Sequence, residues 1–159
     1  AGPEILPPGP SVHDYYRQWF AGDGYPMWSF WENIRSWWEI RHLPNVMLVH
    51  FSDLKRDLPG SIREIAAFLE IDIDENKFPA IVEHSSFDYM KRHAHLAAPL
   101  GGVIWEGGAS TFINKGTNGR WRDTLTPAEV RAYEARAVAE LGKDCAAWLE
   151  MGRCLQHAA

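Results

Sequence analysis

Apolar residues recur at intervals of three and four in four stretches of the chain, which is the pattern of a helix with one buried face. Three of these stretches open with a serine or threonine that is followed three residues later by an acidic residue, the signature of a capping box. The pairs are Ser11 with Asp14, Ser61 with Glu64, and Thr126 with Glu129. We therefore expect helices over residues 11–22, 28–41, 61–69 and 126–142, and a further helix from Asp74 to about His84.

A different pattern occupies residues 46–51, where Val-Met-Leu-Val-His-Phe forms a short apolar and β-branched run. Such a run is typical of a strand buried inside a parallel sheet. A single strand cannot satisfy its own N–H and C=O groups, so it needs neighbouring strands. We expect these neighbours either in strands that the pattern does not reveal or on a segment preceding Ala1. The fold class expected is α/β, mostly helical, with one clear strand of a parallel sheet.

Two stretches lack a regular period. Residues 1–10 are rich in proline and glycine and are expected to be a linker or loop. Residues 93–119 are rich in glycine and alanine and are expected to form a long loop, and long loops in compact domains often carry function. With 159 residues, 46% of them hydrophobic, the chain can form one compact domain, which we place at residues 11–159.

Charge and cysteine content narrow the class of protein. The net charge of −5 argues against the broad positive surface that nucleic-acid binding needs. Cys145 and Cys154 fit neither a disulfide framework nor a CxxC metal pair, and we interpret them as reduced thiols. The first residues lack the pattern of a signal peptide, and the longest apolar run is too short to span a membrane. We expect a soluble cytoplasmic protein.

The candidate chemistry lies in the segment from Phe112 to Trp121, which combines a lysine, two glycines and several small polar residues. Glycines let backbone N–H groups approach an anion, and a neighbouring ammonium adds charge, so such a loop suits phosphate. A solvated turn is the other interpretation of this segment, since short motifs often match by chance.

Three segments together resemble the cytosolic-type sulfotransferases that use 3'-phosphoadenosine 5'-phosphosulfate (PAPS). Asn114 to Arg122 is similar to the family pattern RKGxxGDW followed by Lys or Arg. His50-Phe-Ser-Asp-Leu-Lys55 resembles its Tyr-Glu-Asp-Leu/Met-Lys, and His84-Ser-Ser-Phe-Asp-Tyr-Met-Lys91 resembles its His-Thr/Ser-Ser-Phe-x-x-Met-Lys. The motifs occur in the family's order, and the resemblance covers residues 11 to about 133.

The resemblance implies a site for the nucleotide. The 3'-phosphate would be held by Lys115, by the backbone of Gly116 and by Asn114, which stands in the place of the family's arginine. Asparagine cannot supply the charged fork of arginine, so another cation would be needed. Arg120 is a candidate for that cation, and a solvated surface arginine is the alternative.

The adenine side would be formed by Ser85, Ser86 and Phe87, with Phe51 in the place of the family's tyrosine. For both phenylalanines a purely structural place in the core is the alternative. Val103, Ile104 and Trp105 are candidates for an apolar lid over the acceptor, and a loop without ligand contact is the alternative.

Two other interpretations are weaker. His84, His93 and His95 could suggest metal ligands, but no cysteine or carboxylate pattern completes a tetrahedral site, so no metal is expected. Several tryptophans could suggest a platform for carbohydrate, but helical spacing places most of them in the core; they are Trp19, Trp28, Trp31, Trp37 and Trp38.

The function implied by the resemblance is sulfuryl transfer from PAPS to a hydroxyl or amine of a small-molecule acceptor. The family's phosphosulfate loop and catalytic histidine do not occur in this sequence, so no catalytic residue is assigned here. They are expected on an N-terminal half of a sulfotransferase domain with a P-loop-type fold, which would be a partner of this chain. The family's dimer motif is altered, since Arg122, Thr126-Pro127 and Arg131 stand at its positions. A homodimer would therefore use another surface.

The alternative from another class is a non-catalytic nucleotide-binding or interaction module derived from the same fold. A related P-loop kinase fits the Lys-Gly and Ser-Ser-Phe segments less well.

Overall fold

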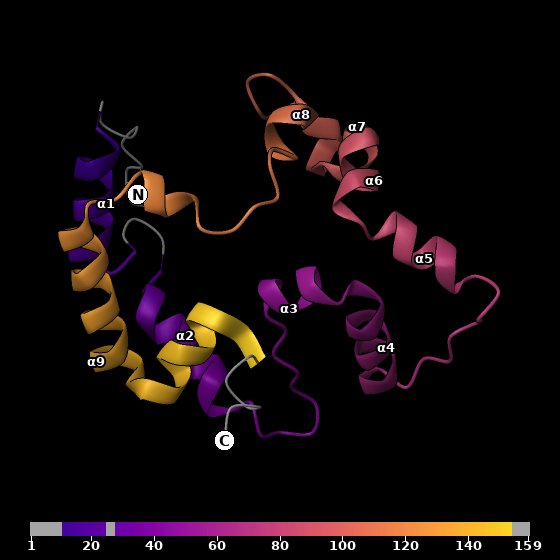
Figure 1. Cartoon of the computed structure of the whole chain (residues 1–159), viewed down its shortest axis with the longest axis horizontal. Helices are drawn as coiled ribbons and strands as arrows, with labels where there is room; N and C mark the ends of the chain where they lie inside the picture. Colours follow the sequence, from indigo (N-terminus) through magenta and orange to yellow (C-terminus); the bar gives the residue numbers. More distant parts are fainter. Residues whose placement is uncertain (1–10, 25–27, 154–159) are drawn as a thin grey trace, which may run out of the picture. The chain divides into compact units, whose positions relative to one another are not determined.

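The computed structural model describes residues 11–24 and 28–153, which are built from short helices joined by loops (Figure 1). They divide into two compact units. The terminal unit combines the two ends of the chain, Ala1–His50 and Gly119–Ala159, and the central unit is the continuous segment Phe51–Asn118. The expected linker at residues 1–10 and Cys154 lie outside the described residues, and the assignment of residues 11–159 to a single domain stays a prediction.

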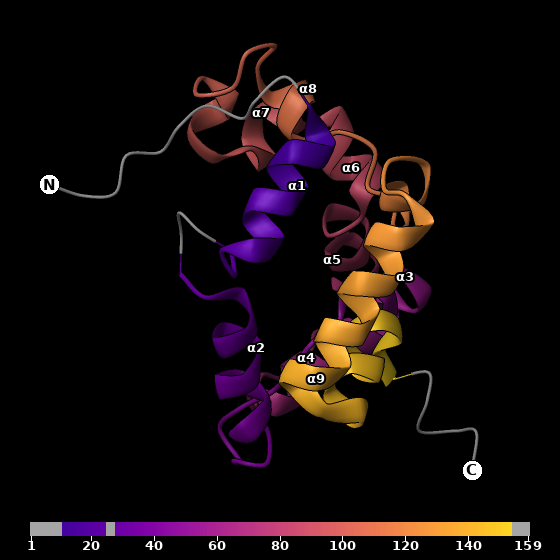
Figure 2. The same cartoon turned by 90° about the vertical axis from the view of Figure 1, so that its left-hand side faces the viewer.

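The terminal unit is helical. Its elements are α1 (Val12–Ala21), α2 (Phe30–Glu39), the 3-10 turn η2 (Arg120–Asp123) and α9 (Pro127–Met151). Helix α9 lies beside α2 in both views (Figures 1 and 2). The core between these two helices is formed by Trp31, only 2% exposed, and by Cys145, only 1% exposed. Trp31 packs against Tyr133 of α9 with 5.5 Å between the ring centroids.

The helix starts in this unit confirm the capping signals of the sequence. The Ser11 hydroxyl accepts the Asp14 N–H at the start of α1. At the start of α9, Thr126 and Glu129 form a complete capping box, with Pro127 in the first turn. The first helical segment of α9 ends at Gly142, as the sequence predicted, because this glycine adopts a non-helical backbone with φ 76° and ψ 164°. A second helical segment, which the sequence did not predict, follows this kink and continues to Met151.

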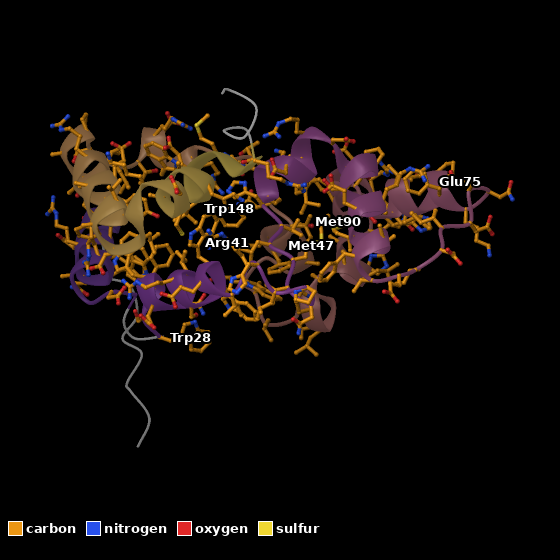
Figure 3. All side chains as sticks on the ribbon, turned by 90° about the horizontal axis from the view of Figure 1, so that it is seen from below. Trp28, Arg41, Met47, Glu75, Met90 and Trp148 are labelled. Carbon is orange, nitrogen blue, oxygen red and sulfur yellow. The ribbon has the colours of Figure 1, made fainter. Side chains whose placement is uncertain are left out.

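The tryptophans are less uniformly buried than their spacing predicted. Trp31 is buried, but Trp37 is 52% exposed and Trp28, labelled in Figure 3, is 70% exposed. Trp38 is half-buried against Trp148 of α9, and their ring centroids are 5.4 Å apart. The expectation that most tryptophans belong to the core therefore fails for Trp28 and Trp37.

The central unit is a succession of short helices in which neighbours along the chain contact each other. Helices α6, α7 and α8 gather together at one end of it (Figure 1). The elements are α3 (Phe51–Arg56), α4 (Leu58–Phe68), α5 (Phe78–His84), α6 (Phe87–Arg92), α7 (Ala94–Ala97), η1 (Pro99–Gly102) and α8 (Ala109–Phe112).

The prediction of a strand at residues 46–51 is wrong. No strand occurs among residues 11–24 and 28–153; residues 46–50 have no regular hydrogen-bonded structure, and Phe51 is the first residue of α3. The physical reason is the one that made a lone strand doubtful, since the described part of the chain offers no second strand to pair with. The described residues are therefore mostly helical.

Two helix starts and one loop also differ from the prediction. Helix α4 begins at Leu58, because the Asp57 carboxylate accepts the Gly60 N–H at 2.9 Å and Pro59 is tolerated in a first turn. Helix α5 begins only at Phe78, although it ends at His84 as predicted. The expected loop at 93–119 is interrupted by α7, η1 and α8, leaving irregular segments before and after α8.

Candidate functional site

All the residues that the sequence analysis assigned to the nucleotide and the lid lie in the central unit, Phe51–Asn118. They come from the start of α3, from the start of α6, and from the segments before and after α8. Arg120, the candidate for an additional cation, lies in the terminal unit, and its role stays a prediction.

Side chains of helix α3 hydrogen-bond to the segment that contains the candidate phosphate loop. The Lys55 ammonium donates to the backbone carbonyl of Gly116 at 2.5 Å. The side-chain amide of Asn118 donates to the Ser52 hydroxyl at 3.0 Å. The loop around Gly116 is thereby joined at two points to one helix more than sixty residues away in sequence.

The ring of Phe87 lies directly against Gly116. A β-carbon added at position 116 would lie 2.5 Å from Cδ2 and Cε2 of Phe87, far closer than non-bonded carbons approach. Gly116 also has a φ of 58°, a left-handed conformation that favours glycine. The structure therefore requires glycine here for two separate reasons, and it brings the adenine candidate Phe87 next to the phosphate candidate Gly116.

Ser86 places Phe87 at the first position of α6. The Ser86 hydroxyl accepts the Tyr89 N–H at 3.2 Å, as an N-cap does, and donates to the Glu83 carbonyl at 2.6 Å. Because a hydroxyl has one proton, this arrangement leaves Ser86 with acceptor capacity only. Ser85 is exposed and its N–H closes the last turn of α5 on Ile81.

Two lysines lie over the two candidate adenine rings in the same way. Lys55 follows Phe51 by one turn of α3, and Lys91 follows Phe87 by one turn of α6. Each ammonium lies 5.9 Å from the centroid of its ring, within the range of a cation–π contact. Lys115 and Asn114 are exposed on the loop that follows α8. Three lysines, Lys55, Lys91 and Lys115, therefore belong to the segments where the motifs predicted an anion.

The alternative, that the two phenylalanines are purely structural core residues, has a different outcome for each ring. Phe51 is 52% exposed, so it is not a core residue of the central unit. Phe87 is half-buried, and part of its surface is covered by Gly116. Both rings thus keep accessible surface, as a base-contacting ring must.

The three lid candidates lie between η1 and α8 but do not behave alike. Val103 is 80% exposed and Ile104 is 62% exposed, so both present apolar side chains to solvent. Trp105 is half-buried and packs against Phe112 with 4.4 Å between the ring centroids. Their action as a lid stays a prediction.

Neither a metal centre nor a membrane span is found in the part of the chain that the structure describes. No three His, Cys, Asp or Glu side chains gather there in a way that could hold a metal ion. The ring of His93 stacks on Tyr89 at a centroid distance of 4.1 Å, and the ring of His84 lies tilted against Tyr89 at 4.4 Å. Among the same described residues, no helix is both long enough and apolar enough to cross a membrane.

The structure also reveals a polar cluster that the sequence analysis treated only as a helix cap. Glu129 is 9% exposed; its carboxylate accepts from Thr126 and lies 3.0 Å from His13 Nδ1 and 3.3 Å from Arg17 Nε. Hydrogen bonds from Thr126, led by its backbone N–H, together with the contact to His13 lower the pKa of Glu129 to about 2, although burial opposes the shift. The cluster joins α1 to the start of α9 and is structural.

Lys55 and Lys91 are the candidate site residues that sequence reasoning missed. Both are the last residues of segments that resemble the family, but the resemblance implies no role for either. The signal available was the repeated spacing Phe-x-x-x-Lys, at Phe51 to Lys55 and at Phe87 to Lys91. At helical pitch this spacing places each lysine on the same side as its ring.

Comparison with known proteins identifies the class. Residues 6–144 match the family model described as the sulfotransferase domain, and the chain therefore belongs to the sulfotransferase family. It is 30% identical over 135 residues to sulfotransferase 2A6 of Rattus norvegicus, covering 84% of this chain and 47% of that protein. It is 29% identical over 143 residues to sulfotransferase 1A1 of the same species, covering 88% and 48%. The chain thus spans about half the length of these relatives.

Two solved structures have a similar fold. Mouse sulfotransferase SULT7A1 complexed with PAP aligns with a TM-score of 0.75 and 23% identity, over 91% of this chain and 52% of that one. Retinol dehydratase in complex with androsterone and inactive cofactor PAP aligns with a TM-score of 0.69 and 27% identity, over 84% and 39%. The fold of the described residues is therefore that of part of a sulfotransferase.

Proposed function

We propose that this chain supplies the 3'-phosphate and adenine side of a PAPS site in a sulfotransferase. The observation that carries the proposal is the contact between Phe87 and Gly116, which joins two motifs of the family resemblance in one place. Both similar solved structures are complexes with PAP, which supports a nucleotide of this kind for this chain.

The arrangement suits the nucleotide chemically. Lys115 and the backbone N–H of Gly116 would hold the 3'-phosphate, and the missing β-carbon at Gly116 lets backbone approach the anion closely. Phe51 and Phe87 would contact the adenine with their accessible faces. Ser86, whose hydroxyl can still accept, would take a hydrogen bond from the exocyclic amine of the base.

The reaction that we propose for the whole protein is transfer of the sulfuryl group of PAPS to a hydroxyl or amine of a small molecule. A new bond from the acceptor atom to sulfur forms while the bond from sulfur to the 5'-phosphate oxygen breaks. The acceptor's proton leaves to a base, and adenosine 3',5'-bisphosphate is released. By analogy with phosphoryl transfer, positioning and charge stabilisation would supply most of the catalysis, without a metal ion.

We assign no catalytic residue in this chain and propose an N-terminal half of a sulfotransferase domain as its partner in the reaction. The sparse core of the described residues supports this, since large apolar side chains such as Trp28, Val103 and Ile104 are exposed. The cytoplasm is the proposed location, by analogy with the family.

Calorimetric titration of adenosine 3',5'-bisphosphate tests the nucleotide site. The chain should bind it more tightly than adenosine 5'-monophosphate, and Lys115→Ala should abolish most of that difference. Lys77→Ala is the matched control, because Lys77 is 77% exposed and pairs with Asp74 before α5. Equal affinity of the unaltered chain for both nucleotides would exclude a 3'-phosphate site. Binding without sulfuryl transfer in the intact protein would favour a non-catalytic module, which Asn114 in the arginine's place supports.

A further inference from the structure

The contact that carries an inference beyond the family motifs is the hydrogen bond from Lys55 to the Gly116 carbonyl. Among the central-unit residues expected at the 3'-phosphate, only Lys115 is a cation, since Asn114 is neutral; Arg120, the other candidate cation, lies in the terminal unit. Lys55 was assigned no part in that site, yet its ammonium is bonded to the backbone of the phosphate loop itself.

The hydrogen bond fixes the orientation of one peptide group. The peptide joining Gly116 to Thr117 is planar and trans, so its C=O and N–H point in opposite directions. When Lys55 holds the carbonyl toward α3, the N–H of Thr117 is turned away from α3. A second hydrogen bond, from the Asn118 amide to the Ser52 hydroxyl at 3.0 Å, attaches the same loop to α3 two residues further along.

Lys55 also brings charge. An ammonium has three N–H donors, and the Gly116 carbonyl occupies one of them. The remaining donors and the full positive charge lie within a few ångströms of the Gly116 backbone. A phosphate that accepts from this backbone would therefore interact with Lys55 as well as with Lys115, over a distance shorter than the screening length of physiological salt, about 8 Å.

We propose that Lys55 determines the specificity of the nucleotide site for a 3'-phosphate. One of its N–H groups orients the peptide that joins Gly116 to Thr117, next to the Gly116 N–H, and its charge supplies a second cation beside Lys115, which Asn114 does not provide. This inference rests on the proposed function, since it concerns the same nucleotide. It adds a residue and a selectivity that the motifs do not assign.

The test compares Lys55→Met, which removes donor and charge, with Lys55→Arg, which keeps both. Binding of adenosine 3',5'-bisphosphate and of adenosine 5'-monophosphate is measured for each, at low and high salt. Lys55→Met should weaken binding of the bisphosphate about tenfold, because a charged hydrogen bond is lost. Binding of the monophosphate should weaken less than twofold. It should also reduce the salt dependence of bisphosphate binding. Lys55→Arg should restore most of the affinity, and Lys77→Met, the exposed control, should change nothing.

Hydrogen exchange of the nucleotide-free chain gives an independent measure of the positioning role. Amides of residues 114–118 should exchange faster in Lys55→Met and return toward the original rate in Lys55→Arg. An equal loss of affinity for both nucleotides, or unchanged exchange in Lys55→Met, would overturn the proposal for Lys55. Failure of the unaltered chain to prefer the bisphosphate would instead overturn the proposed function, so the two failures are distinguishable.

Discussion

The ring of Phe87 occupies the space that a side chain on Gly116 would need, with 2.5 Å between Cδ2 of the ring and the position of a β-carbon. The two residues belong to different motifs and are brought together by the fold of the central unit. Their contact makes position 116 the most sensitive place in the candidate site to test.

Gly116→Ala should weaken nucleotide binding and lower stability. The left-handed backbone costs an alanine about 1–2 kcal/mol, and overpacking against Phe87 adds about 1–3 kcal/mol if the ring cannot move. Thermal unfolding and calorimetric titration measure the two effects. In Phe87→Ala combined with Gly116→Ala the overpacking cost disappears, so the double variant should lose less than the sum of the single changes. Strict additivity would show that the contact is not present in solution.

Phe51→Ala should weaken binding of adenosine 3',5'-bisphosphate by about 1–3 kcal/mol, the range measured for loss of one aromatic contact to a base. Because Phe51 is 52% exposed, the same change should leave the melting temperature nearly unaltered. Phe51→Tyr keeps the ring and serves as the control, which should bind at least as well as the unaltered chain. A drop in stability with unchanged affinity would assign Phe51 to packing.

We expect the stability of the terminal unit to fall at low pH because of the Glu129 carboxylate. Its pKa is lowered to about 2 from an ordinary value of 4.5, chiefly by the hydrogen bond from the Thr126 backbone N–H. A depressed folded-state pKa means that the stabilisation is complete above 4.5 and is lost as the pH falls through about 2. Glu129→Gln should therefore lose less stability than the unaltered chain between those two pH values. The measurement is the melting temperature against pH, with the exposed Glu106→Gln as control; parallel curves for all three would contradict the assignment.

The cap of α4 predicts a local stability effect in the central unit. Asp57→Ala removes the acceptor of the Gly60 N–H and should cost about 0.5–2 kcal/mol, measured by denaturant unfolding. Asp57→Asn keeps an oxygen acceptor at the same place and should cost only a fraction of this. If the helix started at Ser61, as the capping pattern in the sequence suggested, Ser61→Ala would be the more damaging change.

Local signals of the sequence predicted the helices whose ends are set by neighbouring residues. Thr126, Pro127 and Glu129 together determine the start of α9 because each acts within one turn. The short helices α7 and α8 escaped prediction, since four residues complete about one turn and show no hydrophobic period.

The strand at 46–51 failed for the opposite reason, because its formation depends on partners elsewhere. An apolar, β-branched run favours an extended backbone, but a strand forms only when a second strand is present to pair with it. In the candidate site, too, features set by neighbouring residues were predicted and features that depend on distant residues were not. Motifs identified Phe87 and Gly116 separately, whereas the contact between them, and the bond from Lys55, join positions that no local period relates.

The hydrogen bond between Ser52 and Asn118 joins the two ends of the central unit. The chain therefore leaves the terminal unit and returns to it at neighbouring points, which is the geometry of an inserted module. Such a segment can be lengthened, shortened or exchanged between related proteins without altering the path of the chain outside it. The contacts proposed for the nucleotide at Phe51, Phe87, Gly116 and the three lysines all lie within residues 51–118, so a graft of this segment would transfer them together.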